Sequence, residues 1–369
     1  MRQTPTVRAA ALTGFDALAR TYGLNPAALL RAAGLPADAE RDPDRRLPTS
    51  ALNWMFERAA AQAGAEDFGL RLAELRGFSN LGPVTLLARD EPDIRSALAI
   101  FTSYLPLHNE ALTIDLSEED GLAILSCTVA GEGPRIQATD VAVAMLHRIL
   151  RQLLGPQWQA QAVYLERPCP IHAHRFAQAY ASPVYFAQDF SGIVFDPADL
   201  DRPNLLAEAA LRPYTAQLRA ALPGLADLPL EERICRLLRA MLPGRRCTAP
   251  LMAERLGLSR RTMERRLAVR GLTFHGLLDE VRSELARGQL SGTSRSNAEI
   301  AELLGFASSA AFTAWFATCH GLPPQTWRRR HGSASNAPCD PAPAPPQSPR
   351  ITRRAGRHPT QNETAEDAR

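Results

Sequence analysis

Hydrophobic spacing along the chain before Pro203 alternates between a helical and a strand-like period. Apolar residues three or four positions apart predict helices, and short apolar runs predict strands. The expected helices cover residues 7–22, 25–34, 49–63, 81–88, 93–104, 139–154 and 172–181. The expected strands cover residues 111–116, 122–129, 161–166, 183–186 and 192–195, the first two forming a hairpin. This order predicts an α+β domain over residues 1–203.

The spacing changes after Pro203. Residues 204–231 are expected to form a helical connector, and residues 232–331 keep a helical period and predict an all-α domain. Residues 332–369 include the run Pro341–Pro346 and no apolar period, which predicts a disordered, Pro-rich tail. The chain has no run of 18 apolar residues and no secretion signal at its start, so we expect a cytoplasmic protein with no membrane partner.

One short pattern occurs twice in the helical region, as Ala253–Leu258 and Ala301–Phe306. Each copy has a small alanine, a glycine four positions later and an apolar residue, and leads into a segment that begins with serine, at Ser259 and at Ser308. The alanine lets two helices cross closely and the glycine takes the turn between them, so each copy predicts a helix-turn-helix. A linker helix over residues 274–290 is expected to join the units and to help place their recognition helices about one DNA turn apart.

Charge is distributed unevenly along the chain. Residues 1–243 hold 23 arginines against 28 acidic residues, whereas residues 244–331 hold 14 arginines against seven acidic residues. Because the chain contains no lysine, position is more informative than the number of arginines. A basic module joined to an acidic one is typical of a DNA-binding end attached to a domain with another role.

The first recognition helix is expected over residues 259–270, with Met263 and Leu267 facing the core. Arginines in its first turn oppose the helix dipole unless an anion such as a DNA phosphate is present. Arginine binds the guanine edge and glutamate accepts from cytosine, although a solvated arginine-rich face is the alternative interpretation. The predicted DNA contacts of this helix are Arg260, Arg261, Glu264 and Arg265.

The second recognition helix, over residues 309–320, has no arginine between Ser308 and His320. Hydroxyl groups and backbone N–H groups at its start can bind phosphates, and methyl groups can contact thymine. Its predicted DNA contacts are Ser308, Ser309, Ala310, Thr313 and Ala314. The two units are therefore expected to differ in how strictly they specify bases.

The sequence contains no clear catalytic motif. The six cysteines include no Cys-x-x-Cys pair, and the sequence shows no nucleophile elbow and no phosphate-binding glycine loop. His172 and His174 lack a third ligand at short spacing, so neither a metal nor a cofactor is predicted. His108 and Arg135, near the predicted hairpin, are candidates to face a small-molecule effector, with a surface or packing role as the alternative.

Residues 232–330 resemble the AraC/XylS family of transcription regulators. The resemblance rests on Gly257–Arg265, Arg282, Ala286, Ile300-Ala301, Leu304–Phe306, Phe312, Phe316 and Gly321–Arg328. It implies a bacterial, dimeric regulator that binds promoter DNA and activates RNA polymerase. Members commonly carry basic residues near Ala314 and Ala317, which this chain lacks.

The N-terminal part resembles the arabinose-binding-type sensor domain of the ornithine- and virulence-regulator branch. Leu81-Gly82, Leu105–His108 and Val194-Phe195 carry that resemblance. Three hypotheses remain open: an effector-controlled regulator, a regulator whose first domain only mediates dimerisation or protein interaction, and a DNA-binding module fused to an enzyme. DNA-alkylation repair methyltransferases exemplify the last, but they need a zinc-held cysteine cluster that this sequence lacks.

Overall fold

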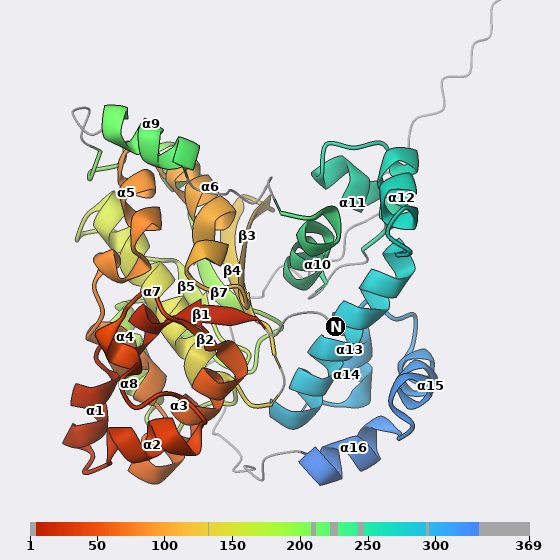
Figure 1. The fold of residues 1–369 in the computed structure, drawn as a ribbon, viewed down its shortest axis with the longest axis horizontal. Helices are drawn as coiled ribbons and strands as arrows, with labels where there is room; N and C mark the ends of the chain where they lie inside the picture. The colour runs from red at the N-terminus through yellow and green to blue at the C-terminus, as the bar shows by residue number, and fades with distance from the viewer. Residues whose placement is uncertain are drawn as a thin grey trace, which may run out of the picture. The chain divides into compact units, whose positions relative to one another are not determined.

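The computed structural model of the chain describes residues 5–131, 133–207, 212–221, 228–242, 247–292 and 295–331. Its buried apolar side chains form two large cores, one between Val7 and Leu200 and the other between Ile234 and Phe316 (Figure 1). The predicted tail and parts of the predicted connector lie outside the described residues. None of the described helices is both long and apolar enough to cross a membrane.

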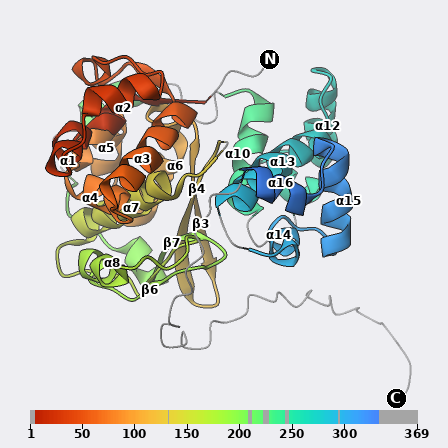
Figure 2. The ribbon, with the colours of Figure 1, turned by 90° about the horizontal axis from the view of Figure 1, so that it is seen from below.

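The first core is enclosed by helices packed on a mixed sheet. Figure 2 shows α7 and its neighbouring helices on one face of that sheet, and α7 packs on β4 and β7. The helices are α1 (Phe15–Thr21), α2 (Pro26–Ala32), α3 (Thr49–Ala63), α4 (Phe68–Glu74), α5 (Pro83–Arg89), α6 (Ile94–Tyr104), α7 (Ile136–Leu154), α8 (Ala173–Tyr180) and α9 (Arg212–Ala221). Short 3₁₀ helices are η1 (Ala9–Leu12), η2 (Ala39–Arg41), η3 (Phe78–Leu81), η4 (Leu105–Leu107) and η5 (Pro197–Asp201).

The five-stranded sheet has the order β3-β4-β7-β5-β6. Its strands are β3 (Leu112–Glu119), β4 (Leu122–Val129), β5 (Ala162–Tyr164), β6 (Val184–Tyr185) and β7 (Ser191–Phe195). Among the strands that the structure describes, only β5 and β6 pair in parallel. The predicted hairpin is β3-β4, and its two-residue turn places both Asp120 and Gly121 at positive φ, which selects aspartate and glycine there.

The prediction of one helix over residues 7–22 is wrong at its start. Thr6–Arg8 forms strand β1, which pairs with β2 (Arg46–Pro48), and η1 follows before α1 begins. Gly14, at φ +82°, separates η1 from α1. The spacing of apolar residues did not predict β1, because its partner strand β2 lies beyond α1 and α2 in the sequence. No pattern in the sequence marked β2 as a strand.

Helix α7 is buried along most of its length and brings charged groups into the first core. Asp140 forms an ion pair with Arg167, and both side chains are almost fully buried. Burial raises the pKa of Asp140 to about 6, although Arg167 opposes the change. At the start of the helix the Gln137 N–H donates to Glu57 Oε1 at 2.7 Å. Burial raises the pKa of Glu57 to about 7, with Asp140 contributing in the same direction.

Replacing Glu57 by glutamine should change how stability depends on pH. The pKa of Glu57 is higher in the folded protein, about 7, than its ordinary value of 4.5, so the folded state binds more protons between these values. Stability should therefore fall as pH rises through this window, and E57Q should remove that contribution, up to about 3 kcal/mol. Urea unfolding of both proteins from pH 4.5 to 8 measures it. Parallel pH curves would contradict the assignment, because Asp140 contributes equally to both.

The second core is entirely helical. In Figure 1, α13 runs between the α11–α12 pair and the α14–α15 pair. Its apolar side includes Leu277, Val281 and Leu285, all buried as the spacing predicts. The helices are α10 (Leu230–Met241), α11 (Ala249–Arg255), α12 (Arg260–Ala268), α13 (Phe274–Gly292), α14 (Asn297–Leu303), α15 (Ser309–His320) and α16 (Pro324–His331). The predicted fold class, α+β followed by an all-α region with two helix-turn-helix units, is confirmed.

Candidate nucleic-acid interface and effector cavity

The two copies of the repeated pattern fold into the same turn. Gly257 and Gly305 both adopt positive φ, +65° and +70°. Leu258 N–H donates to the Ala253 carbonyl (2.9 Å), and Phe306 N–H donates to the Ala301 carbonyl (2.8 Å). Each glycine N–H also bonds the carbonyl three residues earlier, so both turns are Schellman motifs. The duplicated pattern therefore encodes two equivalent helix-turn-helix units.

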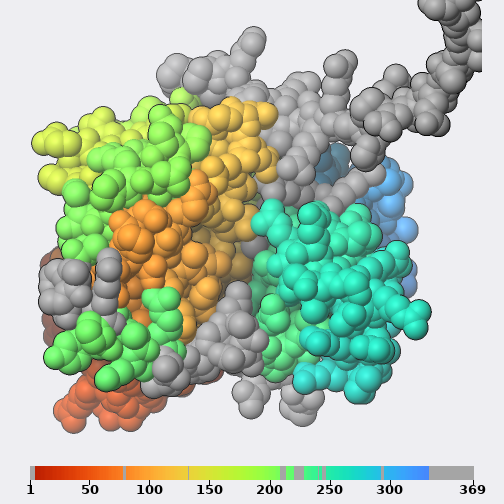
Figure 3. Space-filling view, turned by 90° about the horizontal axis from the view of Figure 1, so that it is seen from above, coloured from red at the N-terminus to blue at the C-terminus, as the bar shows by residue number. Residues whose placement is uncertain are grey.

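Helix α12 follows the first turn and presents a basic face. Ser259 caps it, because its Oγ accepts from the Thr262 N–H at 3.2 Å. Met263 and Leu267 are fully buried, which leaves the predicted contact residues exposed. Figure 3 shows the teal surface formed by α11, α12 and the start of α13.

The four side chains on α12 that are predicted to contact DNA differ in whether they already form an ion pair. Arg260 Nε donates to Glu264 Oε1 at 2.8 Å, so these two side chains pair with each other. No described residue forms an ion pair with Arg261 or Arg265, one helical turn apart on the same face. An exposed pair costs only about 0.3–0.5 kcal/mol to break. Arg261 and Arg265 are therefore the side chains most ready to meet a polyanion.

Helix α15 presents a small, uncharged surface. Ser308 caps it by accepting from the Ala311 N–H at 3.2 Å. Phe312 and Phe316 are fully buried, whereas Ala310 and Ala314 are exposed and Thr313 is half-buried. Ser309 is also half-buried. As expected from the sequence, α12 exposes a basic surface and α15 exposes a small, uncharged one.

Helix α16 was missed by the sequence analysis. Trp327 anchors it, with its ring 5.8 Å from the ring of Phe316 on α15. Arg329 and Arg330, in its last turn, are exposed. Proline at the first helical position and arginines in the last turn were the signals that could have predicted it. The second unit thus has nearby cationic groups although α15 has none.

Arg282 on α13 holds the second turn in place. Its guanidinium donates to the carbonyls of Leu304 (3.0 Å) and Gly305 (3.2 Å) and lies 4.4 Å from the centre of the Phe306 ring. Burial lowers the pKa of Arg282. The linker helix α13 therefore supports the turn that sets the orientation of α15.

Arg282→Met should destabilise this region by about 1–2 kcal/mol, because two carbonyls lose a charged donor while apolar volume is retained. Arg255→Met is the matched control. Arg255 is exposed on α11, so its change should stay within about 0.5 kcal/mol. Urea unfolding compares the two variants. Equal losses from both would show that Arg282 does not stabilise the turn.

The helical side of the first core contains a cavity of about 80 Å³. Its wall is mostly apolar and comes from η1, α3, α6, α7 and the β3-β4 hairpin. His108, a predicted effector contact, lines this cavity together with Arg76, Thr49 and Asn53. Arg135 does not line it. Arg135 lies at the start of α7 and donates to the Gly131 carbonyl, and burial lowers its pKa.

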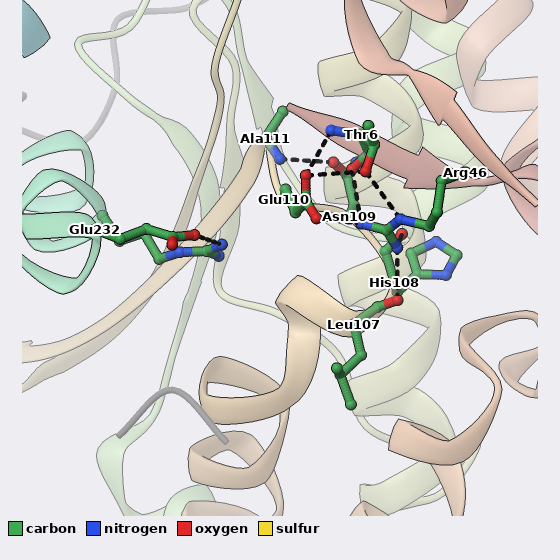
Figure 4. Close-up of polar contacts among 9 residues, drawn as sticks. Thr6, Arg46, Leu107, His108, Asn109, Glu110, Ala111 and Glu232 are labelled. Atoms are coloured by element: carbon green, nitrogen blue, oxygen red, sulfur yellow. Dashed lines mark hydrogen bonds and ion pairs between the residues drawn. The ribbon is translucent and has the colours of Figure 1, made fainter. Parts of the chain in front are cut away.

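A polar network next to the cavity holds the backbone of His108, whose carbonyl accepts from Arg46 Nη1 at 3.4 Å (Figure 4). Thr6 donates from its N–H and its hydroxyl to Glu110 Oε2, at 2.8 and 2.9 Å, and Arg46 donates to the Leu107 carbonyl at 2.8 Å. The ring nitrogen Nδ1 of His108 has no hydrogen-bond partner among the described residues. Burial, together with the charges of nearby arginines, lowers the pKa of His108 to about 3, so the ring is neutral at physiological pH.

His172 and His174 are exposed at the start of α8, with ring centres 6.0 Å apart. No group of three potential metal ligands occurs among the described residues. Of the five described cysteines, Cys127, Cys235 and Cys247 are buried, and Cys339 lies outside the described residues.

Each of the two main regions of the chain matches a known protein family. Residues 23–204 match the arabinose-binding domain of AraC transcription regulators, N-terminal part, and residues 252–330 match a helix-turn-helix domain. The chain belongs to the AraC family of transcription regulators. The second match contains both Schellman turns, α12, α15 and most of α16, so the basic face of α12 lies within the DNA-binding domain of this AraC-type regulator.

Individual relatives cover nearly the whole AraC-type chain. The HTH-type transcriptional regulator VirS of Mycobacterium tuberculosis is 28% identical over 330 residues, which cover 88% of this chain and 97% of VirS. The ornithine utilization regulator of Pseudomonas aeruginosa is 28% identical over 316 residues, 84% of this chain and 93% of that protein. Among solved structures, the transcriptional regulator CdpR from Pseudomonas aeruginosa is 18% identical, with a TM-score of 0.39, over 85% of this chain and 97% of CdpR.

Proposed function

We propose that this transcriptional regulator is an activator that binds operator DNA as a homodimer, contacts RNA polymerase and responds to a small-molecule effector held by residues 1–203. The observation that carries the DNA-binding part is the pair of matched turns leading into capped helices, of which α12 exposes the free Arg261 and Arg265. The cavity around His108 supports effector control, because it lies within the first core and its wall includes polar atoms without partners among the described residues.

The nine predicted DNA contacts divide by chemistry in this proposal. Arg261 and Arg265 read base edges, and Arg260 and Glu264 join them after their mutual ion pair opens. Ser308, Ser309 and Thr313 bind phosphate, and Ala310 and Ala314 contact thymine methyl groups. Arg329 and Arg330 on α16 add phosphate contacts.

Genome-wide mapping of DNA occupancy, followed by a promoter–reporter assay, tests the proposal. Occupied promoters should lose transcription when the gene is deleted, and purified protein should protect a site in those promoters. Higher transcription after deletion would make the protein a repressor. Absence of any protected site would contradict sequence-specific binding.

Dimerisation is tested separately by sedimentation. The intact chain should be dimeric, whereas a fragment of residues 232–331, which contains the second core, should be monomeric and should bind DNA more weakly. Two linked modules gain affinity through their effective concentration. A dimeric fragment together with a monomeric full-length chain would reject the assignment of dimerisation to residues 1–231.

A further inference from the structure

The cavity in the first core has room only for a small ligand. Its volume is about 80 Å³, several times the roughly 10–15 Å³ that a single water requires, so the cavity can hold a small ligand. Aliphatic and aromatic side chains form most of its wall, among them Leu52 and Phe56 of α3 and Leu146 and Ile149 of α7. A ligand that fills this space must be largely apolar.

One wall of the cavity carries an uncompensated positive charge. Arg76 is only 6% exposed. Its Nε donates to the Thr13 carbonyl at 3.2 Å and its Nη2 to the Ala11 carbonyl, but it has no acidic partner among the described residues. Burial lowers the pKa of Arg76 to about 9, and no nearby carboxylate raises it. The Arg76 guanidinium also lies 5.8 Å from the centre of the Phe56 ring. Two carbonyl dipoles and one aromatic face compensate a buried guanidinium less well than a carboxylate does, so this site favours an anion.

Three further polar atoms in the wall lack partners. Thr49 Oγ1, Asn53 Nδ2 and His108 Nδ1 are each buried and make no hydrogen bond with a described residue. The threonine hydroxyl and the asparagine amide are donors, and the neutral imidazole donates from one of its two nitrogens. Unmatched donors in a buried wall are costly unless a ligand accepts from them. Together with Arg76 they form a set suited to the two oxygens of a carboxylate.

We propose that the cavity binds a small aliphatic monocarboxylate of about four to six carbon atoms. The carboxylate accepts from Arg76 and from the unpartnered donors, and the alkyl chain lies against the apolar side chains of α3 and α7. Only the regulatory consequence of this binding rests on the proposed function; the binding itself does not.

A sugar fits the same cavity poorly. Every carbon of arabinose carries an oxygen, and each buried hydroxyl needs a hydrogen-bond partner. The wall offers mainly aliphatic surface and a few polar groups, among them a cation that a neutral sugar leaves uncompensated. The lining of this cavity therefore does not suit arabinose, which is the ligand named in the description of the matching N-terminal family.

Calorimetric titration of the full-length protein with three probes tests the ligand class. Hexanoate should bind with a dissociation constant of about 1 mM or tighter, which a ligand of eight non-hydrogen atoms can reach. Hexan-1-ol, with the same chain and no charge, should bind at least tenfold more weakly, and L-arabinose should show no binding. Equal binding of the alcohol, or binding of arabinose without hexanoate, would overturn the proposal.

Variants locate the bound carboxylate. Arg76→Met should weaken hexanoate at least tenfold and leave hexan-1-ol unchanged, whereas Arg76→Lys should retain most of the affinity. Arg71→Met is the control, since Arg71 pairs with Asp67 outside the cavity. If Arg76→Met does not fold, Ala142→Leu fills the cavity while keeping the cation and should abolish binding of both probes. Undiminished hexanoate binding in Ala142→Leu would place the acid elsewhere and refute the site.

A reporter assay separates the two proposals. Binding of hexanoate without any change in transcription would leave the ligand class standing and contradict effector control by this ligand. A transcriptional response to a non-acidic metabolite, with no binding of hexanoate, would support effector control and overturn the carboxylate assignment.

Discussion

The double variant Arg261→Ala/Arg265→Ala should lose about 2–6 kcal/mol of operator affinity, because each bidentate arginine contact to guanine contributes about 1–3 kcal/mol. Arg265→Ala alone should lose about 1–3 kcal/mol and relax base preference at one or two positions. Both side chains are exposed and free of ion pairs with described residues, so no structural contact is removed. Selection from a randomised operator, followed by binding titrations, measures affinity and base preference together.

Two matched controls separate base reading from general attraction. Thr313→Ala on α15 should cost well under about 1 kcal/mol with little change in preference, because a hydroxyl offers one phosphate hydrogen bond. Arg329→Ala/Arg330→Ala should weaken all sequences alike and reduce the salt dependence. Each half-site should then show one strictly specified, G/C-containing segment and one tolerant segment about a turn away. Equally strict base preference under both units would refute this asymmetry. A larger loss of operator affinity from Thr313→Ala than from Arg265→Ala would also refute it.

Phe312→Ala should lower the free energy of unfolding by about 3–5 kcal/mol. The ring is fully buried and lies 5.6 Å from Phe306, 5.7 Å from Phe316 and 6.3 Å from Trp315, measured between ring centres. Its removal leaves a cavity at the centre of the second helix-turn-helix unit, where the aromatic cluster supports α15 and α16. DNA affinity should also fall, because α15 loses its support.

Urea unfolding followed by tryptophan fluorescence measures this loss, since Trp315 and Trp327 belong to the cluster. Thr318→Ala, at an exposed position of the same helix, should change stability by no more than about 0.5 kcal/mol. A loss from Phe312→Ala no larger than that of this control would show that the cluster does not stabilise the unit.

Local sequence patterns predicted much of the helical region correctly because short-range rules determine it. The glycines at 257 and 305 adopt the positive φ that the repeated pattern requires, and Ser259 and Ser308 cap the helices that follow. The predicted bounds of α15 agree with the structure. Capping, turn geometry and the helical period all act between near neighbours in the chain, so they can be read without knowing the fold.

Features that depend on distant residues were not predicted. Strand β1 pairs with β2, which follows only after α1 and α2. The sheet order β3-β4-β7-β5-β6 likewise joins strands from separate parts of the chain. Arg260 and Glu264 were both predicted DNA contacts, and the structure shows that they also form an ion pair at i,i+4 spacing.

The sequence by itself determined the two helix-turn-helix units, the basic face of α12, the uncharged face of α15 and membership of the AraC family. Only the tertiary structure decided which groups surround the cavity in the first core. Thr49 and Asn53 lie one turn apart on α3, but Arg76 and His108 come from other parts of the sequence, and only chain folding brings all four to the lining of the cavity. A recognition helix is one continuous segment with a readable period, whereas a ligand cavity is assembled from several elements and leaves no linear motif.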